Sequence, residues 1–332
     1  MKKIIKNNYK LLLAFVIGII VASTTAYAAA ILMDSEYVGY DNTKTGFQDS
    51  NGNDVEDVQT AIDELYTKAT TIECKTGYIK QNETSLGYEC VPPPPPKCIR
   101  ATTLHTSNGV TYGRLGSGGT LVSGDAFDCD VDGTGNYTER FYYVSDLYDT
   151  SKKDFDDTIA VLIYYSNVDT DAVASTSKKV KYNADNHNYE GPGSEILDLL
   201  PTSGEGGDWS NISLTNSTRQ ILTEKGTTST TGGALPTAFS YAGKAARLLT
   251  AQEVLNACDG LTTTNWGGSG ALDTCRYLTE GNNNWWLETP RAFAGEYVWN
   301  VYGNFRFVSN LDANFTYGVR PVIEVPKSAL SL

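Results

Sequence analysis

The chain has 332 residues and a mass of 36.0 kDa, with 40% hydrophobic and 20% charged residues, enough for one large or two modest globular units. Its 39 acidic and 26 basic residues give a net charge of −13. A chain of that charge repels phosphate, so we expect no nucleic-acid partner. The two histidines, His105 and His187, exclude a three-histidine metal site and leave any histidine-based triad two candidates for its base.

The first 28 residues have the pattern of an export signal. Four lysines precede an unbroken apolar run at 11–22, and Ala26 and Ala28 are small residues at the positions of a cleavage site. The alternative is an uncleaved signal anchor, because residues 11–33 carry no charge and are long enough to span a hydrocarbon core of about 30 Å. Both predict an extracellular or cell-surface protein exported by the general secretory route, with membrane contact through the N-terminal segment only.

All six cysteines lie beyond this signal, and an even number in an exported chain predicts disulfide bonds. Because short loops close most readily, we expect local pairs. The alternative is that some cysteines stay reduced and buried, and no C-x-x-C spacing points to zinc. The predicted pairs are Cys74–Cys90, Cys98–Cys129 and Cys258–Cys275.

An amphipathic helix is predicted at residues 54–69. Its apolar residues recur at spacings of three and four, and Glu56 and Asp57 lie in the first turn, where the helix dipole favours acids. Two heptads are too short for a stable isolated coiled coil, so the stripe packs either within a monomer or against other copies in a homo-oligomer. The stripe consists of Val55, Val58, Ile62, Leu65 and Ala69.

The same region resembles a known module. The segment 40–46 (YDNTKTG) followed by 58–65 (VQTAIDEL) is similar to a repeated unit of phage tail-fibre necks and bacterial surface proteins. That resemblance implies that residues 29–91 form part of an oligomeric stalk.

Two further features lie between this helix and the rest of the chain. Residues 74–90 contain two Gly-Tyr pairs between cysteines, which predicts a small disulfide-closed hairpin. Five consecutive prolines at 92–96 must adopt the polyproline II conformation, a semi-rigid rod of roughly 15 Å. The prolines therefore mark the boundary of a C-terminal domain at 97–332.

The C-terminal domain is predicted to belong to the α+β class, since short strand patterns and a few helices are separated by long polar loops. We expect a tight hairpin turn at 302–305 and a capping box at Thr250 and Glu253. Strands are expected at 140–144, 159–165, 296–302, 305–308 and 318–325. Helices are expected at 194–200, 217–224 and 250–258.

Four blocks of this domain resemble a large group of secreted bacterial proteins whose fold is related to formylglycine-generating enzymes and C-type lectins. The resemblance implies an irregular C-type-lectin-like domain with short antiparallel strands and few helices. It also implies that Arg320 is structural, buried against acids or backbone carbonyls. The blocks are 246–253 (ARLLTAQE), 286–290 (WLETP), 296–300 (EYVWN) and 317–322 (YGVRPV).

Residues 128–139 carry the spacing of a calcium loop, D-x-D-x-D-G with a glutamate at position 12. Carboxylates on alternate residues converge when Gly133 permits a sharp turn, and Glu139 can close the shell with both oxygens. The alternative is a solvated acidic turn between strands. The candidate ligands of a structural Ca²⁺ are Asp128, Asp130, Asp132, Thr134 and Glu139.

Aromatic residues gather between 285 and 307, interleaved with asparagines. Such rings can stack on sugar rings while amides bond the hydroxyls. The alternative is that a loop-rich fold needs these side chains for its core, with Trp299 pointing inward. The candidate ligand-binding residues are Trp285, Trp286, Trp299, Tyr302 and Phe305.

No nucleophile motif or phosphate-binding loop occurs near either histidine. We therefore expect a non-catalytic surface protein that acts in adhesion or ligand recognition, with an extracellular glycan or protein as its partner. The alternatives are a structural fibre component that contacts its own copies, and a carbohydrate-active enzyme, which needs two carboxylates across a cleft.

Overall fold

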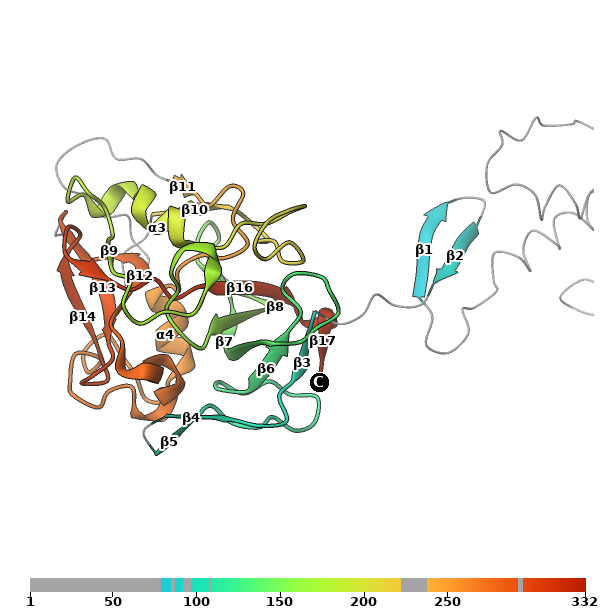
Figure 1. Cartoon of the computed structure of the whole chain (residues 1–332), viewed down its shortest axis with the longest axis horizontal. Coiled ribbons are helices and arrows are strands. Elements are labelled where there is room, and N and C mark those ends of the chain that lie inside the picture. The colour runs from blue at the N-terminus through green and yellow to red at the C-terminus, as the bar shows by residue number, and fades with distance from the viewer. Residues whose placement is uncertain (1–78, 85–86, 92–96, 108, 222–237, 292–294) are drawn as a thin grey trace, which may run out of the picture. The chain divides into compact units, whose positions relative to one another are not determined.

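The computed structural model describes residues 79–84, 87–91, 97–107, 109–221, 238–291 and 295–332. The chain divides into two compact units, 1–93 and 94–332, and the division falls within the proline run (Figure 1). The predicted export signal at 1–28, the helix at 54–69 and Cys74 lie outside the described residues. Within the described ranges, no helix is long and apolar enough to cross a membrane.

In the first unit, two strands pair antiparallel, β1 (Ile79–Thr84) and β2 (Gly87–Val91). They lie within the segment for which a hairpin was expected. Because Cys74 is not described, the bond between Cys74 and Cys90 stays a prediction.

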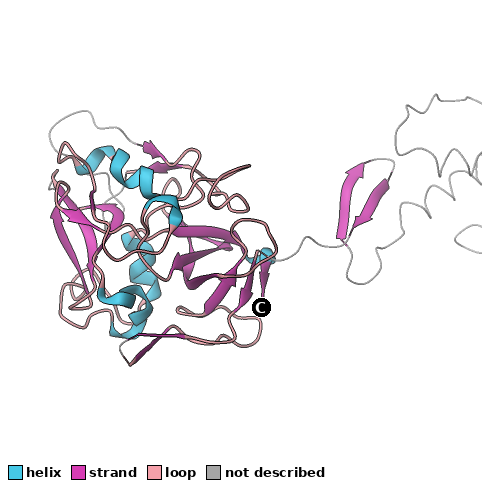
Figure 2. Cartoon of the chain, viewed as in Figure 1, coloured by secondary structure: helices cyan, strands magenta, loops and turns pink. Residues whose placement is uncertain are grey.

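The second unit consists mostly of strands with few helices, as predicted (Figure 2). Its largest element is a six-stranded sheet in the order β16-β8-β7-β6-β3-β17, antiparallel except where β17 pairs parallel with β3. The strands are β3 (Cys98–Arg100), β6 (Ala126–Cys129), β7 (Glu139–Asp149), β8 (Asp154–Tyr164), β16 (Val322–Pro326) and β17 (Leu330–Ser331).

Both faces of this sheet are covered, because successive side chains of a strand point to opposite faces. On β7, Phe141 and Tyr143 belong to one apolar cluster, whereas Tyr142 and Val144 belong to another. Strands buried on both faces read as continuous apolar runs rather than as alternating ones. That explains the uninterrupted apolar sequence at Ile159–Tyr164 in β8.

A second, three-stranded sheet has the order β12-β13-β14 and lies on the far side of α4 from the six-stranded sheet (Figure 1). The helix α4 (Ala251–Ala257) contacts both β7 and β12. Its capping box is confirmed, since Thr250 and Glu253 bond each other's backbone N–H. The sheet strands are β12 (Trp285–Pro290), β13 (Tyr297–Tyr302) and β14 (Phe307–Asp312).

The remaining elements are short and connect these layers. Three two-stranded ladders pair β4 (His105–Ser107) with β5 (Val110–Tyr112), β9 (Val180–Lys181) with β15 (Thr316–Tyr317), and β10 (Thr218–Gln220) with β11 (Ala238–Ser240). The helical segments are α3 (Ser194–Leu199) and the 3-10 turns η3 (Thr170–Ala172), η4 (Asn188–Glu190), η5 (Asp273–Asn282) and η6 (Lys327–Ala329).

The helices expected at 194–200 and 250–258 are confirmed as α3 and α4. The helix expected at 217–224 is wrong, because its described part contains the strand β10. Arg219 is 2% exposed and donates to Glu288 and to the carbonyl of Tyr148. These partners come from distant strands, so burial of one arginine fixes an extended backbone that local helix propensity does not reveal.

The turn expected at 302–305 is present but longer. Tyr302 pairs with Phe307, so residues 303–306 form the loop, and Arg306 adopts a positive φ of 55°. The resulting hairpin joins β13 to β14.

Two predicted disulfides are confirmed, Cys98–Cys129 and Cys258–Cys275. The first joins β3 to β6, where the two cysteines are directly opposite in the ladder with 4.0 Å between their Cα atoms. It therefore crosslinks two neighbouring strands of the sheet next to the predicted calcium loop.

The structural role expected for Arg320 is also confirmed. Its side chain is 1% exposed and donates to four backbone carbonyls. Two of these belong to the end of β8 and the residue after it, and two belong to η5. The acceptors are the carbonyls of Tyr164 at 2.6 Å, Tyr165 at 3.1 Å, Tyr277 at 2.9 Å and Leu278 at 2.8 Å.

Candidate functional site: a polar groove at the end of the sheet

A groove of about 600 Å³ lies where the loop from β6 to β7 meets the end of β8. Two further loops complete its walls, residues 171–174 and 208–209, and His105 of β4 also lines it. These segments are far apart in the sequence. The six-stranded sheet brings the β6–β7 loop and the end of β8 together, because β6, β7 and β8 are neighbours and β6 and β8 end where β7 begins.

A row of rings lines the groove. His105 lies edge-on to Tyr165 with 4.8 Å between ring centroids, and Tyr165 lies 4.7 Å from Tyr164. Trp209 continues the row at 5.5 Å from Tyr164. Tyr164 and Trp209 are buried, whereas Tyr165 is half-buried and His105 has 38% of its side chain exposed. Tyr165 and His105 therefore present ring surface to a ligand.

Four carboxylates line the same groove, and hydrogen bonds fix three of them. The Tyr164 hydroxyl donates to Glu139 at 2.6 Å. The backbone N–H and hydroxyl of Thr134 donate to Asp132, which lowers the pKa of Asp132 and keeps it ionised at neutral pH. In the same way, the N–H and hydroxyl of Thr202 donate to Asp208 at 3.0 and 2.9 Å. The fourth acid, Asp171, is exposed.

Arg140 is the single arginine or lysine among the described residues that line the groove. It is 5% exposed, and its Nε donates to Asp128 at 2.7 Å. Its buried Nη1 has no hydrogen-bond partner among the described residues, although the side chain as a whole is held by Asp128.

The predicted calcium ligands lie around one end of this groove but do not converge. Asp128 is paired with Arg140, and Glu139 accepts from Tyr164. Asp130 fits a cation best, because it is 5% exposed and its Oδ1 lacks a partner, while its Oδ2 accepts from the Gly135 N–H. Among the described residues, no three of the ligating side chains His, Cys, Asp and Glu form a cluster able to hold a metal.

The turn within this loop is the sharp one expected, since Gly133 has a φ of +74°. The remaining predicted ligand, Thr134, uses its hydroxyl to bond Asp132. The structure therefore shows the loop geometry, and calcium binding stays a prediction.

The three candidate tryptophans belong to the core. Trp285 and Trp286 are 1% and 0% exposed, and each indole N–H donates to a backbone carbonyl. Trp299 is 8% exposed and packs 4.3 Å from Trp266. Alternation along β12 and β13 places these rings between layers, so they are not available to a ligand at the surface.

The other two candidates lie at the surface. Tyr302 stacks on Phe307 across the hairpin, with 5.4 Å between centroids and 10° between ring planes, and Phe305 is 53% exposed in the loop. We call Tyr302, Phe305 and Phe307 the hairpin tip. Phe305 is the exposed ring of the tip, Tyr302 and Phe307 are half-buried, and none of the three lines the groove.

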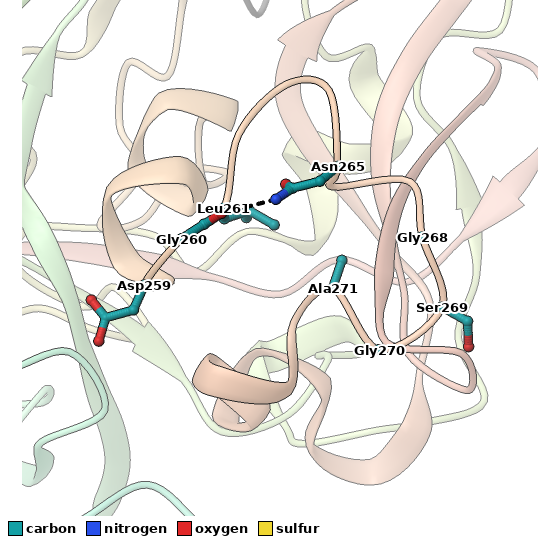
Figure 3. Close-up of a pocket in the computed structure, with 8 residues that line it drawn as sticks. All are labelled: Asp259, Gly260, Leu261, Asn265, Gly268, Ser269, Gly270 and Ala271. Carbon is teal, nitrogen blue, oxygen red and sulfur yellow. Dashed lines mark hydrogen bonds between the residues drawn. The ribbon is translucent and has the colours of Figure 1, made fainter.

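A second pocket, of about 300 Å³, lies within the loop between Cys258 and Cys275 (Figure 3). The Asn265 side chain donates to the Gly260 carbonyl at 2.9 Å and holds one wall of the pocket. Asp259 and Ser269 point away from its centre (Figure 3). This pocket offers no charged side chain toward its interior and carries no functional argument.

Sequence reasoning identified Asp132 and Glu139 but missed most of the groove. His105, Tyr165 and Trp209 belong to no motif, because each lies in a different loop or strand end. Tertiary packing places them side by side, and no local sequence signal reports that.

Comparison with known proteins gives no family model, no curated protein and no solved structure that matches this chain. We therefore infer the function from the chemistry of the groove.

Proposed function

We propose that the protein is an exported, non-catalytic surface protein whose C-terminal unit recognises a glycan in the groove. The observation that carries this proposal is the combination of exposed ring surface and fixed carboxylates in one groove. Sugars present apolar ring faces together with many hydroxyl donors and acceptors, and this lining complements both.

The proposal fits the rest of the chain. The predicted N-terminal export signal and the two disulfides agree with an oxidising, extracellular setting. In this proposal the second unit is a C-type-lectin-like recognition domain, and residues 29–91 form a stalk that joins copies through the helix at 54–69. In the alternative function, a fibre component that contacts its own copies, the hairpin tip would form the contact between copies.

A matched pair of variants tests recognition in the groove. We expect Tyr165→Ala to weaken glycan binding about tenfold, because it removes ring surface from the groove. Phe305→Ala removes a comparable ring from the hairpin tip and should leave binding unchanged. The full chain and both variants are compared on an array of immobilised oligosaccharides, with thermal melts as a check of folding. Loss of binding in Phe305→Ala but not in Tyr165→Ala would contradict the proposed site.

A structural Ca²⁺ beside the groove is also part of this proposal. We expect millimolar Ca²⁺ to raise the melting temperature of the full chain by several degrees relative to a chelator, since an ion that binds only the folded state stabilises it. Asp130→Asn should abolish the shift, because Asp130 is the acid of the 128–139 loop that is buried and has an unpaired oxygen. Asp198→Asn on α3 serves as the control and should retain it. Equal melting temperatures with calcium and chelator would show that residues 128–139 form an acidic turn without an ion.

A further inference from the structure

The groove has an unbalanced charge. Its lining holds four carboxylates, while Arg140, its single arginine or lysine among the described residues, is already paired with Asp128. Clefts lined by one sign of charge concentrate their field and attract the opposite charge. A neutral glycan leaves this charge uncompensated, whereas a ligand that carries an ammonium group neutralises part of it.

The carboxylates are held in position before any ligand arrives. Glu139 is fixed by Tyr164, Asp132 by Thr134, and Asp208 by Thr202 (distances above). Acceptors that are already oriented lose little conformational freedom on binding, which favours a charge-assisted hydrogen bond to an ammonium.

The ring of Tyr165 supplies an independent observation. This half-buried ring lines the groove and offers a surface both to the apolar face of a sugar and to a cation. A hydroxylated ring with a free amine fits both the ring surface and the carboxylates.

We propose that the groove binds glycans whose amino sugars carry a free ammonium group, in preference to the same glycans in N-acetylated form. This inference rests on the proposed function and names its ligand class. Acetylation converts the ammonium to a neutral amide, so it removes the charge that the carboxylates recognise while leaving the ring and its hydroxyls in place.

The test compares two tetrasaccharides that differ only in acetylation, the β-1,4-linked tetramers of glucosamine and of N-acetylglucosamine. Titration calorimetry with the full chain at about pH 6, where carboxylates are ionised, should give an affinity about tenfold higher for the glucosamine tetramer. Raising the salt concentration should reduce that difference, because exposed charges are screened. Equal affinities, or tighter binding of the acetylated tetramer, would overturn this inference and leave glycan recognition standing. Binding of neither tetramer, together with no binding on the oligosaccharide array, would overturn both.

Isosteric variants locate the preference. Glu139→Gln and Asp171→Asn each remove one charge from the groove and should weaken binding of the glucosamine tetramer severalfold, and more than they weaken binding of the acetylated tetramer. Asp198→Asn makes the same change of charge on α3, outside the groove, and should change neither affinity. If Asp198→Asn weakens binding as much as Glu139→Gln, the preference is a general effect of net charge and the assignment to the groove is overturned.

Discussion

Replacing Arg247 with methionine is expected to lower the free energy of unfolding by about 3–5 kcal/mol, because it leaves buried acids without their partner. Arg247 is 0% exposed. Its Nη1 and Nη2 donate to the two carboxylate oxygens of Glu253 at 2.9 and 2.6 Å, and its Nε donates to Glu324 at 2.7 Å. Chemical denaturation of the full chain at neutral pH measures the change.

The control is Arg306→Met, which breaks the surface ion pair with Asp273. Both partners there are partly exposed, at 35% and 54% of their side chains, and exposed pairs contribute about 0–1 kcal/mol. If Arg247→Met loses no more stability than Arg306→Met, the buried ion pairs of Arg247 with Glu253 on α4 and Glu324 on β16 do not stabilise the contact between these elements.

The same network sets a dependence on pH. Burial raises the pKa of Glu253, but the charge and hydrogen bonds of Arg247, together with Arg219 and the Thr250 N–H, hold this pKa below its usual 4.5. A carboxyl with a lowered pKa in the folded state stabilises fully above the unfolded value and loses that contribution as the pH falls through the folded pKa. The contribution of this ion pair to the stability of the wild type should therefore be present above about pH 4.5 and decrease as the pH falls below it, which unfolding measured over a range of pH checks.

Replacing Arg320 should produce the second large effect. Arg320→Met removes four hydrogen bonds to backbone carbonyls and leaves those buried acceptors unpaired, which we expect to cost about 3 kcal/mol or more. Burial lowers the pKa of Arg320 to about 10, and the nearby Glu280 opposes that shift, so the side chain remains charged at neutral pH. Denaturant unfolding again provides the measurement.

A conservative variant distinguishes geometry from charge at this position. Arg320→Lys keeps the charge, but one ammonium cannot reach carbonyls on both β8 and η5 at once, so it should recover less than half of the lost stability. Wild-type stability in Arg320→Lys would contradict the view that the guanidinium joins these two segments.

The sequence predicted the parts of the fold that depend on local signals. Apolar runs identify β7 and β8, the pair Thr250 and Glu253 marks the start of α4, and short spacing identifies two disulfides. Each of these depends on residues close in the chain, or on burial of a whole strand, which leaves a visible pattern.

The errors arose where a distant partner decides the structure. The extended backbone at Arg219 is set by Glu288 and Tyr148, which lie 69 and 71 residues away. The sequence is compatible with the tryptophans being either core residues or ligand contacts. The packing of β12 and β13 shows that they are core residues. Five separate segments form the groove, so the spacing of residues in the sequence could identify only the acidic loop at 128–139.

The most direct test of glycan recognition in the groove is to locate the bound ligand. Hydrogen exchange of the full chain, measured by mass spectrometry with and without the glucosamine tetramer, reports which backbone amides become protected. If the groove is the recognition site, the backbone amides of residues 131–140, 171–174 and 208–209 should become protected, and exchange at 302–307 should stay unchanged. Protection confined to the hairpin tip, or to the pocket at 259–271, would contradict the claim that the groove is the recognition site.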